Sequence, residues 1–368
     1  MKNSELCFRS FNYIGSKMKL LDFIESKINE YTGKRLDEIR SFADIFSGTG
    51  VVAYHSLKRG CKKILTNDIQ NYAYVVSSVW TTKNIDVEKV KLLLNEINGD
   101  NDKLDINEIS ATERDFIYNN YTEASDVGRM YLTRLNGYKV DKTRQRLNIL
   151  LGEKRINKDE FNLMLKVLLY AVTGISNIAS VYGAYLKNYK QSSLKNLNLD
   201  VKLIDSMIND DKIEHSSYNI NVTDLLDTVD LSDYEVVYLD PPYVANRSYH
   251  DNYHLLETIS KYDYPNIKGK TGLRDETTTK SKFCSKRDAL EEFRLILGKI
   301  KSKYIFISYS SESIVNKEKM IEILQENWDD VKCYEKNYQR FKSNKNSDEK
   351  QAKNVVEYLF CGKKRGNC

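Results

Sequence analysis

Residues 234–243 read YEVVYLDPPY, and this stretch organises the rest of the chain. The β-branched, apolar run from Val236 to Leu239 has the length and composition of a buried strand. Pro241 and Pro242 end that strand, because neither can donate a hydrogen bond to a sheet ladder. The chain holds three prolines in 368 residues, so two adjacent prolines directly after Asp240 favour a functional site over an ordinary strand-ending turn.

Asp240, Pro241, Pro242 and Tyr243 together suit a flat ring that carries an exocyclic amino group. The Asp240 carboxylate and the Pro241 carbonyl can accept the two amino hydrogens, and Tyr243 offers a face for stacking. Holding those hydrogens localises the nitrogen lone pair, and Asp240 stabilises the positive charge that develops on nitrogen. A methyl-sulfonium donor lined up behind the nitrogen would complete an in-line displacement.

The Asp-Pro-Pro-Tyr sequence resembles the catalytic motif of amino-methyltransferases that act on nucleic acids, most closely the Dam-like class of adenine-specific DNA methyltransferases. The resemblance covers residues 8–85 and 215–362, and the order of motifs along the chain also matches that class. It implies an α/β fold, a doubly wound, mostly parallel, seven-stranded methyltransferase sheet with an inserted, mainly helical DNA-recognition domain. In such sheets the site lies at the carboxyl edge.

The segment FNYIGSK at residues 11–17 precedes a helical pattern over 18–31. A lysine at the start of a helix opposes the helix dipole. Lys17 therefore needs a partner such as a ligand carboxylate, unless it is an ordinary solvated lysine. By the resemblance, Tyr13, Gly15 and Lys17 form the first cofactor motif, and Lys17 binds the carboxylate of S-adenosylmethionine.

Residues 41–59 read SFADIFSGTGVVAYHSLKR, which predicts a strand, a glycine turn and a helix. Such a unit places backbone N–H groups at the carboxyl edge of the sheet. An acid about 20 residues further on suits a ribose diol, and Asp68 stands there, after the next predicted strand. By the resemblance, the residues that line the cofactor are Asp44, Phe46, Gly48, Gly50, Asp68, Asp224 and Asp240.

Two of these cofactor residues have simpler interpretations. Asp68 could be a turn aspartate at the end of a strand. Asp224 lies in the segment NINVTDLLD, where a short strand is predicted to end, and the resemblance implies that it contacts the adenine amine of the cofactor. A helix N-cap aspartate is the alternative there.

The predicted recognition domain contains two polar, tyrosine-rich and basic stretches. Residues 128–146 read GRMYLTRLNGYKVDKTRQR, in which Asn-Gly predicts a turn or hairpin probe near 128–140. Residues 176–190 read SNIASVYGAYLKNYK and are rich in residue types that contact phosphates and base edges. The DNA-binding candidates are Arg129, Tyr131, Arg134, Asn136, Lys139, Tyr182 and Lys187, although a solvated surface position is the alternative for any single basic residue.

These motifs divide the chain into three predicted regions. Residues 1–85 form the S-adenosylmethionine-binding half of the catalytic domain, 86–214 the target-recognition insertion, and 215–368 the catalytic half. Within the last region, residues 246–287 are polar and carry charges of both signs, which predicts a loop over the active site.

Composition excludes several other classes of protein. The net charge of +5 permits nucleic-acid binding without requiring it. The six cysteines lack zinc-finger or redox spacing, so no metal site is expected. No apolar run approaches the 18 or so residues of a membrane span, which predicts a cytoplasmic protein without membrane partners.

The sequence therefore predicts a site-specific DNA methyltransferase that transfers a methyl group from S-adenosyl-L-methionine to the N6 amino group of adenine. Its partner is double-stranded DNA, and the target base must leave the duplex to reach a pocket at a strand tip. The stretch 246–287 resembles modification enzymes of restriction–modification systems, for which a cognate endonuclease would be encoded nearby. The alternatives are an amino-methyltransferase for cytosine or RNA, and a catalytically silent DNA-binding protein.

Overall fold

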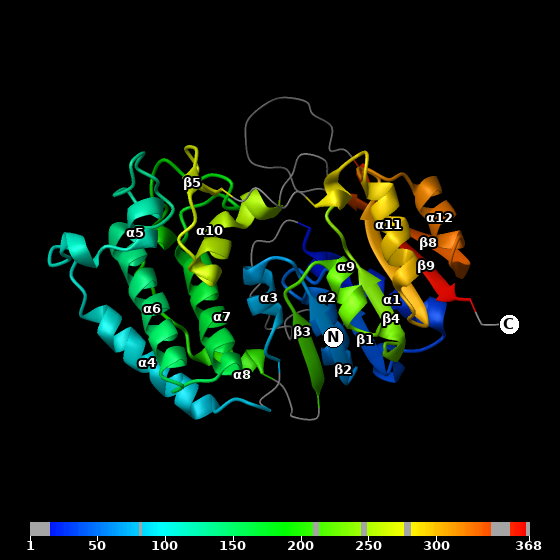
Figure 1. Ribbon diagram of the computed structural model, residues 1–368, viewed down its shortest axis with the longest axis horizontal. Helices are drawn as coiled ribbons and strands as arrows, with labels where there is room; N and C mark the ends of the chain where they lie inside the picture. Colours follow the sequence, from blue (N-terminus) through cyan, green and yellow to red (C-terminus); the bar gives the residue numbers. More distant parts are fainter. Residues whose placement is uncertain are drawn as a thin grey trace. The chain divides into compact units, whose positions relative to one another are not determined.

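The computed structural model describes residues 15–80, 83–208, 213–243, 249–275, 281–339 and 354–365 (Figure 1). The chain separates into two compact units. The helical unit comprises Met1–Ser16, Gln70–Ser217 and Ser248–Thr278, and the sheet unit comprises Lys17–Ile69, Tyr218–Arg247 and Thr279–Cys368. The helical unit thus contains the predicted insertion together with segments that flank it and a segment that follows Asp-Pro-Pro-Tyr.

The sheet has seven strands, as the sequence predicts, in the order β3-β2-β1-β4-β7-β9-β8. β1 pairs in parallel with β2 and β4, and β4 pairs in parallel with β7. β9 runs antiparallel to both β7 and β8. The strands are β1 (Ser41–Asp44), β2 (Lys63–Asn67), β3 (Glu214–Tyr218), β4 (Val236–Leu239), β7 (Tyr304–Ser310), β8 (Trp328–Gln339) and β9 (Asn354–Lys364).

Helices cover both faces of this sheet. Alternate strand residues such as Val237 and Ile305 belong to one apolar cluster with α9 (Val222–Thr228), α11 (Ala289–Lys299) and α12 (Lys317–Gln325). The strand residues that alternate with these point to the opposite face of the sheet. On that face the Phe306 ring packs against the ring of Tyr31 on α1 (Leu21–Thr32), with centroids 5.7 Å apart. All four residues of β4 are buried, as expected for a central parallel strand covered on both sides.

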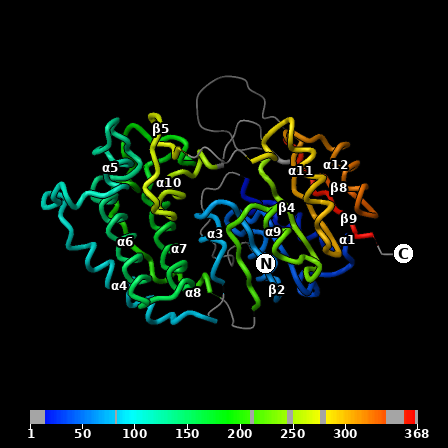
Figure 2. The backbone as a smooth tube through the Cα atoms, in the orientation of Figure 1, coloured from blue at the N-terminus to red at the C-terminus, as the bar shows by residue number. Residues whose placement is uncertain are grey.

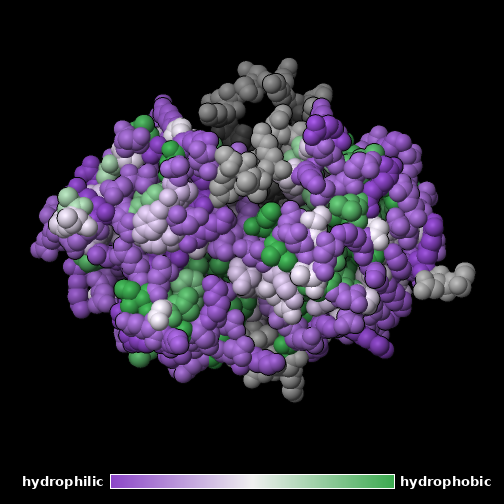
Figure 3. All heavy atoms as spheres, in the orientation of Figure 1, coloured by the Kyte–Doolittle hydropathy of each residue, from purple (hydrophilic) through white to green (hydrophobic). Residues whose placement is uncertain are grey.

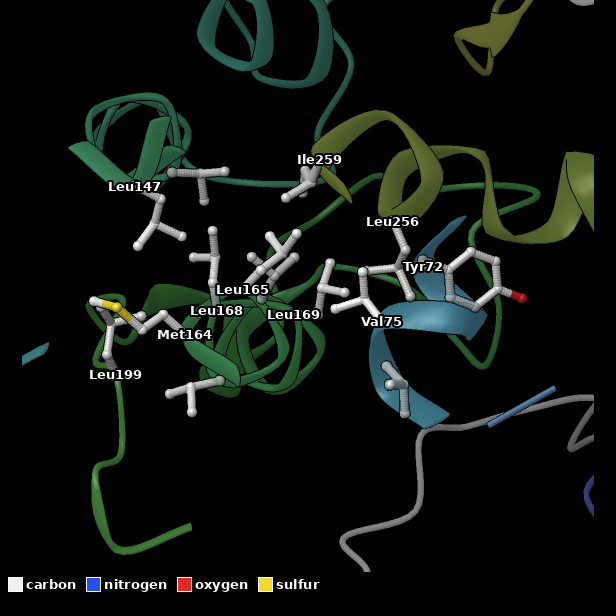
Figure 4. Packing of buried hydrophobic residues seen from close by; sticks show 14 of the residues in the cluster. Tyr72, Val75, Leu147, Met164, Leu165, Leu168, Leu169, Leu199, Leu256 and Ile259 are labelled. Carbon is white, nitrogen blue, oxygen red and sulfur yellow. The ribbon is translucent and has the colours of Figure 1, made fainter. Parts of the chain in front are cut away.

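The core of the helical unit forms around α7 (Lys158–Ile175), whose apolar residues Leu165, Leu168 and Leu169 lie between neighbouring helices (Figure 4). The other elements are α3 (Asn71–Ser77), α4 (Val87–Asp102), α5 (Phe116–Tyr121), α6 (Arg134–Gly152), α8 (Lys202–Met207) and α10 (Tyr249–Lys261). A hairpin of β5 (Ile267–Lys268) and β6 (Leu273–Arg274) follows α10. The predicted, mainly helical character of this region is confirmed.

The prediction of a turn or hairpin at Asn136-Gly137 is wrong, because both residues lie in the first turns of α6. Helix α6 is capped by Thr133, whose hydroxyl accepts the Asn136 N–H at 3.3 Å. Gly137 is required for packing, since an added Cβ would lie 2.4 Å from Thr122 Cγ2 and 3.3 Å from Tyr118 Cα. Tertiary contact with α5 therefore overrides the local turn preference of Asn-Gly.

The prediction of a polar loop over 246–287 is also wrong where the structure describes this segment. Residues 249–261 form α10, and Tyr253, His254, Leu255 and Leu256 are buried in the core of the helical unit. The buried Glu257 carboxylate accepts the N–H groups of Asn71 and Tyr72 at 3.1 and 3.0 Å, at the start of α3. Helix α10, which follows the Asp-Pro-Pro-Tyr motif in the sequence, is thereby attached to α3. Figure 2 shows the two helices as neighbouring parts of the tube.

Hydrophilic residues dominate the face of the protein shown in Figure 3. In the described parts of the chain, no helix has the length and apolar character needed to cross a membrane. Across the same residues, no group of three or more histidine, cysteine or acidic side chains could hold a metal ion.

Candidate active site

Three carboxylates converge at the carboxyl ends of adjacent strands of the sheet unit. Asp44 ends β1, Asp68 follows β2, and Asp240 follows β4. Burial raises the pKa of Asp44 well above its usual range, and the charges of Asp240 and Asp68 raise it further. Asp240 and Asp68, although far from Asp44 in the sequence, therefore lie close enough to it to act on its charge.

Lys17 neutralises part of this acidic site. Its Nζ atom lies 2.8 Å from Asp240 Oδ1, and its side chain is 4% exposed. The same ammonium lies 5.7 Å from the centroid of the Tyr243 ring, within the range of a cation–π contact. Lys17 begins the 3₁₀ turn Lys17–Leu20 that leads into α1, so a short N-terminal element carries this charge to the end of β4.

The two members of the pair respond differently to burial. Burial alone lowers the pKa of Lys17, but the nearby groups, with Asp240 the largest contributor and Tyr243, Tyr238 and Glu357 adding to it, together raise that pKa well above its usual value, so the lysine stays charged. Burial raises the pKa of Asp240, and Lys17 opposes that effect. The result is a carboxylate that accepts hydrogen bonds readily at the tip of β4.

The glycine turn between β1 and α2 (Val51–Arg59) is fixed by Asp68. Gly48 and Gly50 have φ values of +50° and +78°, which residues with a Cβ rarely adopt. The N–H of Gly48 donates to Asp68 Oδ2 at 2.9 Å, and Ser47 N–H donates to Asn67 O at 2.9 Å. The turn therefore presents backbone amides beside a fixed carboxylate.

Aromatic side chains complete the site. The half-buried Tyr243 ring packs edge-on against Tyr309, with centroids 5.3 Å apart. The Tyr243 carbonyl accepts the N–H of Ile314 at 3.3 Å, which anchors the chain just after the two prolines. Phe46 packs edge-on against Phe283 at 5.2 Å.

Sequence comparison decides which family this site belongs to. A family model described as D12 class N6 adenine-specific DNA methyltransferase matches residues 13–323. The chain belongs to this family of methyltransferases. The predicted Dam-like adenine methyltransferase is thereby confirmed.

Three modification enzymes illustrate the similarity. The chain is 34% identical to the type II methyltransferase M.NlaIII of Neisseria lactamica, over 95% of this chain and 98% of that protein. It is 30% identical to M.CviAII of Paramecium bursaria Chlorella virus 1, over 95% and 97% respectively. It is also 34% identical to M.FokI of Planomicrobium okeanokoites, of which it spans about half, 52% of the length.

Asp224, one of the predicted cofactor residues, lies on a helix, in contrast to the sequence prediction. Asp224 does not end a strand, as the sequence predicted. It lies in the first turn of α9, which Asn221 caps, and its side chain is exposed. Tyr13 lies outside the described residues. Gly15 is described, with a φ of +80°, two residues before Lys17.

The seven DNA-binding candidates separate by exposure. Arg129, Tyr131, Asn136, Lys139 and Tyr182 are at most 3% exposed. These five side chains are buried and have no surface free for DNA, which corrects their assignment as direct contacts. For example, Asn136 donates to Lys195 O and accepts from Leu197 N–H, both at 2.8 Å. Arg134 and Lys187 are exposed, and their contact with DNA stays a prediction.

Asn67 is a site residue that the sequence analysis missed. It is buried, its amide donates to Ile45 O at 3.2 Å, and its Oδ1 accepts the N–H of Ile220 at 3.3 Å. It therefore ties the ends of β1 and β2 to the segment before α9. Its position directly before Asp68, at the end of a predicted strand, was the available signal.

Proposed function

We propose that this adenine-specific DNA methyltransferase is the modification enzyme of a restriction–modification system, with S-adenosyl-L-methionine as methyl donor. The observation that carries the catalytic part is the placement of Asp240, Pro241, Pro242 and Tyr243 at the carboxyl end of β4, beside Lys17 and Asp44. The modification role is supported by the similarity to type II methyltransferases over nearly their whole length.

The residues at the sheet edge fit the methyl donor. Asp44 Oδ1 is buried and has no hydrogen-bond partner in the described chain, so an acceptor stands ready for a ligand donor. We infer that Gly48, Gly50, Asp68 and Phe46 hold the nucleoside part. The proposed cofactor site also includes Gly15, Lys17 and Asp224. Tyr13 is added to it by its position in the sequence. When bound, the donor supplies an electrophilic methyl group on sulfur.

The acceptors at the tip of β4 explain how an aromatic amine could be made reactive. The Asp240 carboxylate and the Pro241 carbonyl hold the two amino hydrogens, while Tyr243 stacks on the base. The bond formed joins N6 to the methyl carbon, the carbon–sulfur bond breaks, and one N6 proton is released. The raised pKa of Asp240 makes its carboxylate a better first acceptor for that proton.

Adenine can reach Asp240 only after leaving the duplex, so the reaction requires a flipped base. We expect the helical unit to supply most of the contacts that select the DNA site. We also infer that an endonuclease recognising the same site is encoded beside this enzyme. DNA from cells that express the methyltransferase should then resist that endonuclease, and DNA from cells that express Asp240→Ala should be cut.

Sequencing that detects modified bases, applied to DNA from cells expressing the chain, tests the proposal. We expect N6-methyladenine confined to one short motif. Nucleoside digestion and mass spectrometry of the same DNA and of total RNA would expose methylated cytosine or RNA instead. Soluble protein that binds DNA, but yields no methylated base and shows no binding of S-adenosylmethionine by calorimetry, would overturn the proposal in favour of a silent DNA-binding protein.

A further inference from the structure

The hairpin that follows α10 ends in an exposed, basic tip. Its sequence is IKGKTGLR from Ile267 to Arg274, and Lys268, Gly269 and Lys270 are exposed. Gly269 and Gly272 adopt φ values of +66° and +73°, and the N–H of Gly272 donates to Gly269 O at 3.3 Å. The tip is therefore a tight, glycine-bounded turn that presents Lys270.

Buried side chains hydrogen-bond to the backbone of this tip. Arg129 Nη2 donates to Gly269 O at 3.0 Å, the Tyr131 hydroxyl donates to Thr271 O at 2.9 Å, and the Tyr121 hydroxyl donates to Gly272 O at 3.0 Å. A Cβ on Gly272 would lie 3.0 Å from Arg129 Cδ and 3.1 Å from Tyr121 Cε1. An ordinary surface turn does not need a buried guanidinium and two buried tyrosines to hold it.

The base of the hairpin is equally well fixed. Arg274 is 6% exposed and makes a bidentate pair with Asp263, with N–O distances of 2.9 and 2.6 Å. The N–H of Asp275 donates to Asn266 O at 2.7 Å. Bidentate arginine–carboxylate pairs combine strength with defined geometry. The tip is thus held rigidly at both ends, which reduces the conformational entropy that it would lose on binding.

Tyr131 joins the tip to a second exposed segment. Its hydroxyl also lies 2.8 Å from Tyr182 O, and its ring lies 5.1 Å from that of Tyr185. The exposed Lys187 follows in the same segment. Because the carbonyls of Thr271 and Tyr182 both contact one hydroxyl oxygen, the start of this segment lies beside the hairpin tip.

We propose that the hairpin tip, Gly269–Gly272, and residues 183–188 form one DNA-contacting surface of the helical unit. Lys270 and Lys187 bind phosphates of the duplex, and Arg129 and Tyr131 are positioning residues that hold the two segments together. An ammonium on a rigid turn suits contacts that set the register of a protein on DNA. This inference rests on the proposed function, because it assigns part of the DNA site of the same enzyme.

The test measures how strongly DNA binding depends on salt. Lys270→Ala, Lys187→Ala and the double variant are compared with Lys103→Ala, a matched control whose lysine is 80% exposed after α4. The probe is a fluorescent duplex carrying the motif found by sequencing, titrated at several salt concentrations. We expect the slope of log Kd against log salt to fall by about 1 for each of Lys270 and Lys187, and not for Lys103.

A second variant separates positioning from folding. Tyr131→Phe keeps the ring but loses the hydroxyl that contacts both Thr271 O and Tyr182 O. We expect a higher KM for DNA, with kcat, cofactor affinity and the thermal midpoint close to those of the wild type. If the slope of log Kd against log salt in the double variant equals that of Lys103→Ala, the proposed DNA-contacting surface is overturned. A Tyr131→Phe enzyme with unchanged KM, or with weakened cofactor binding, would overturn the positioning role. Failure of the proposed function would instead appear as wild-type enzyme that methylates no adenine.

Discussion

Lys17 Nζ lies 2.8 Å from Asp240 Oδ1, so the residue predicted to bind the cofactor carboxylate is paired with the residue predicted to hold the target amine. The pair also explains why a lysine at the start of a helix is buried, since Asp240 supplies the countercharge that the helix dipole does not. Lys17 can therefore act in two ways, by attracting an anionic ligand and by orienting Asp240. The two roles can be separated by substitution.

Asp240→Ala should lower the rate of methyl transfer at least about 100-fold, because it removes the carboxylate that stabilises the positive charge developing on the nitrogen. It also removes the carboxylate that lies 2.8 Å from the ammonium of the buried Lys17. Breaking a fully buried pair costs about 3–5 kcal/mol, and since Asp240 is 19% exposed we expect about 2 kcal/mol. Activity and urea unfolding are measured on the same protein. Asp233→Ala, whose side chain is 75% exposed, is the control and should change neither.

Together with Asp240→Ala, the Lys17→Met variant and the Lys17→Met/Asp240→Ala double variant form a double-mutant cycle. The double variant should be less destabilised than the sum of the two single variants, by about 0.5–3 kcal/mol, because neither charge is then left alone. Additive losses of unfolding free energy would show that the pair does not couple in stability.

Gly137→Ala should destabilise the protein even though alanine is the better helix former. In an exposed helix this change would stabilise by about 1 kcal/mol. Here the new Cβ would lie 2.4 Å from Thr122 Cγ2, and overpacking of this kind costs about 1–3 kcal/mol. Gly99→Ala in α4, where nothing lies within 4 Å of an added Cβ, is the matched control and should stabilise.

Thr122→Ser should partly rescue Gly137→Ala. Serine removes the Cγ2 atom but keeps the hydroxyl that donates to Tyr118 O at 2.6 Å. The thermal midpoints of the two single variants and the double variant measure this. Equal destabilisation of Gly137→Ala with and without Thr122→Ser would mean that another contact excludes the side chain.

Gly137 also shows where sequence analysis stops. Local chemistry predicted the strand Val236–Leu239 and the glycine turn after β1, because short motifs fix their own backbone. Asn136-Gly137 has equally strong local chemistry, but the approach of α5 overrides it. The basic and aromatic character of Arg129 and Tyr131 suggested DNA contact, whereas contacts with residues 269–272 bury both. Such long-range contacts leave no signature in a local pattern.

Asp68→Ala should weaken S-adenosylmethionine binding more than the exposed Asp224→Ala does. Asp68 fixes the Gly48 amide at 2.9 Å, so its removal frees the glycine turn as well as removing a carboxylate. Asp224 is exposed on α9, and its loss removes at most one ligand contact. Calorimetric titration with S-adenosylmethionine gives both affinities. Asp227→Ala, on the same helix and paired with Lys299 at 2.6 Å, is the control. A larger effect for Asp224 than for Asp68 would contradict this division of roles.

The stability of the protein should fall in acid partly because of His254. Its Nε2 lies 2.9 Å from Tyr182 O, to which it can only donate, and burial lowers the pKa of His254 to about 4. Between pH 4 and the usual value of about 6.5, the unfolded chain binds a proton that the folded chain excludes. This histidine therefore contributes stability that is fully present above pH 6.5. By pH 4 up to about 3 kcal/mol of it is lost.

His254→Gln should flatten the dependence of unfolding free energy on pH between 6.5 and 4. The glutamine amide can still donate to Tyr182 O but cannot titrate. The variant is expected to be less stable than the wild type at pH 7.5, because it loses ring contacts with Tyr121 and Tyr131 at 5.7 and 5.5 Å. The difference between the two proteins should then shrink as the pH falls. Urea unfolding at intervals across this range measures both curves, and parallel curves would show that His254 does not titrate on unfolding.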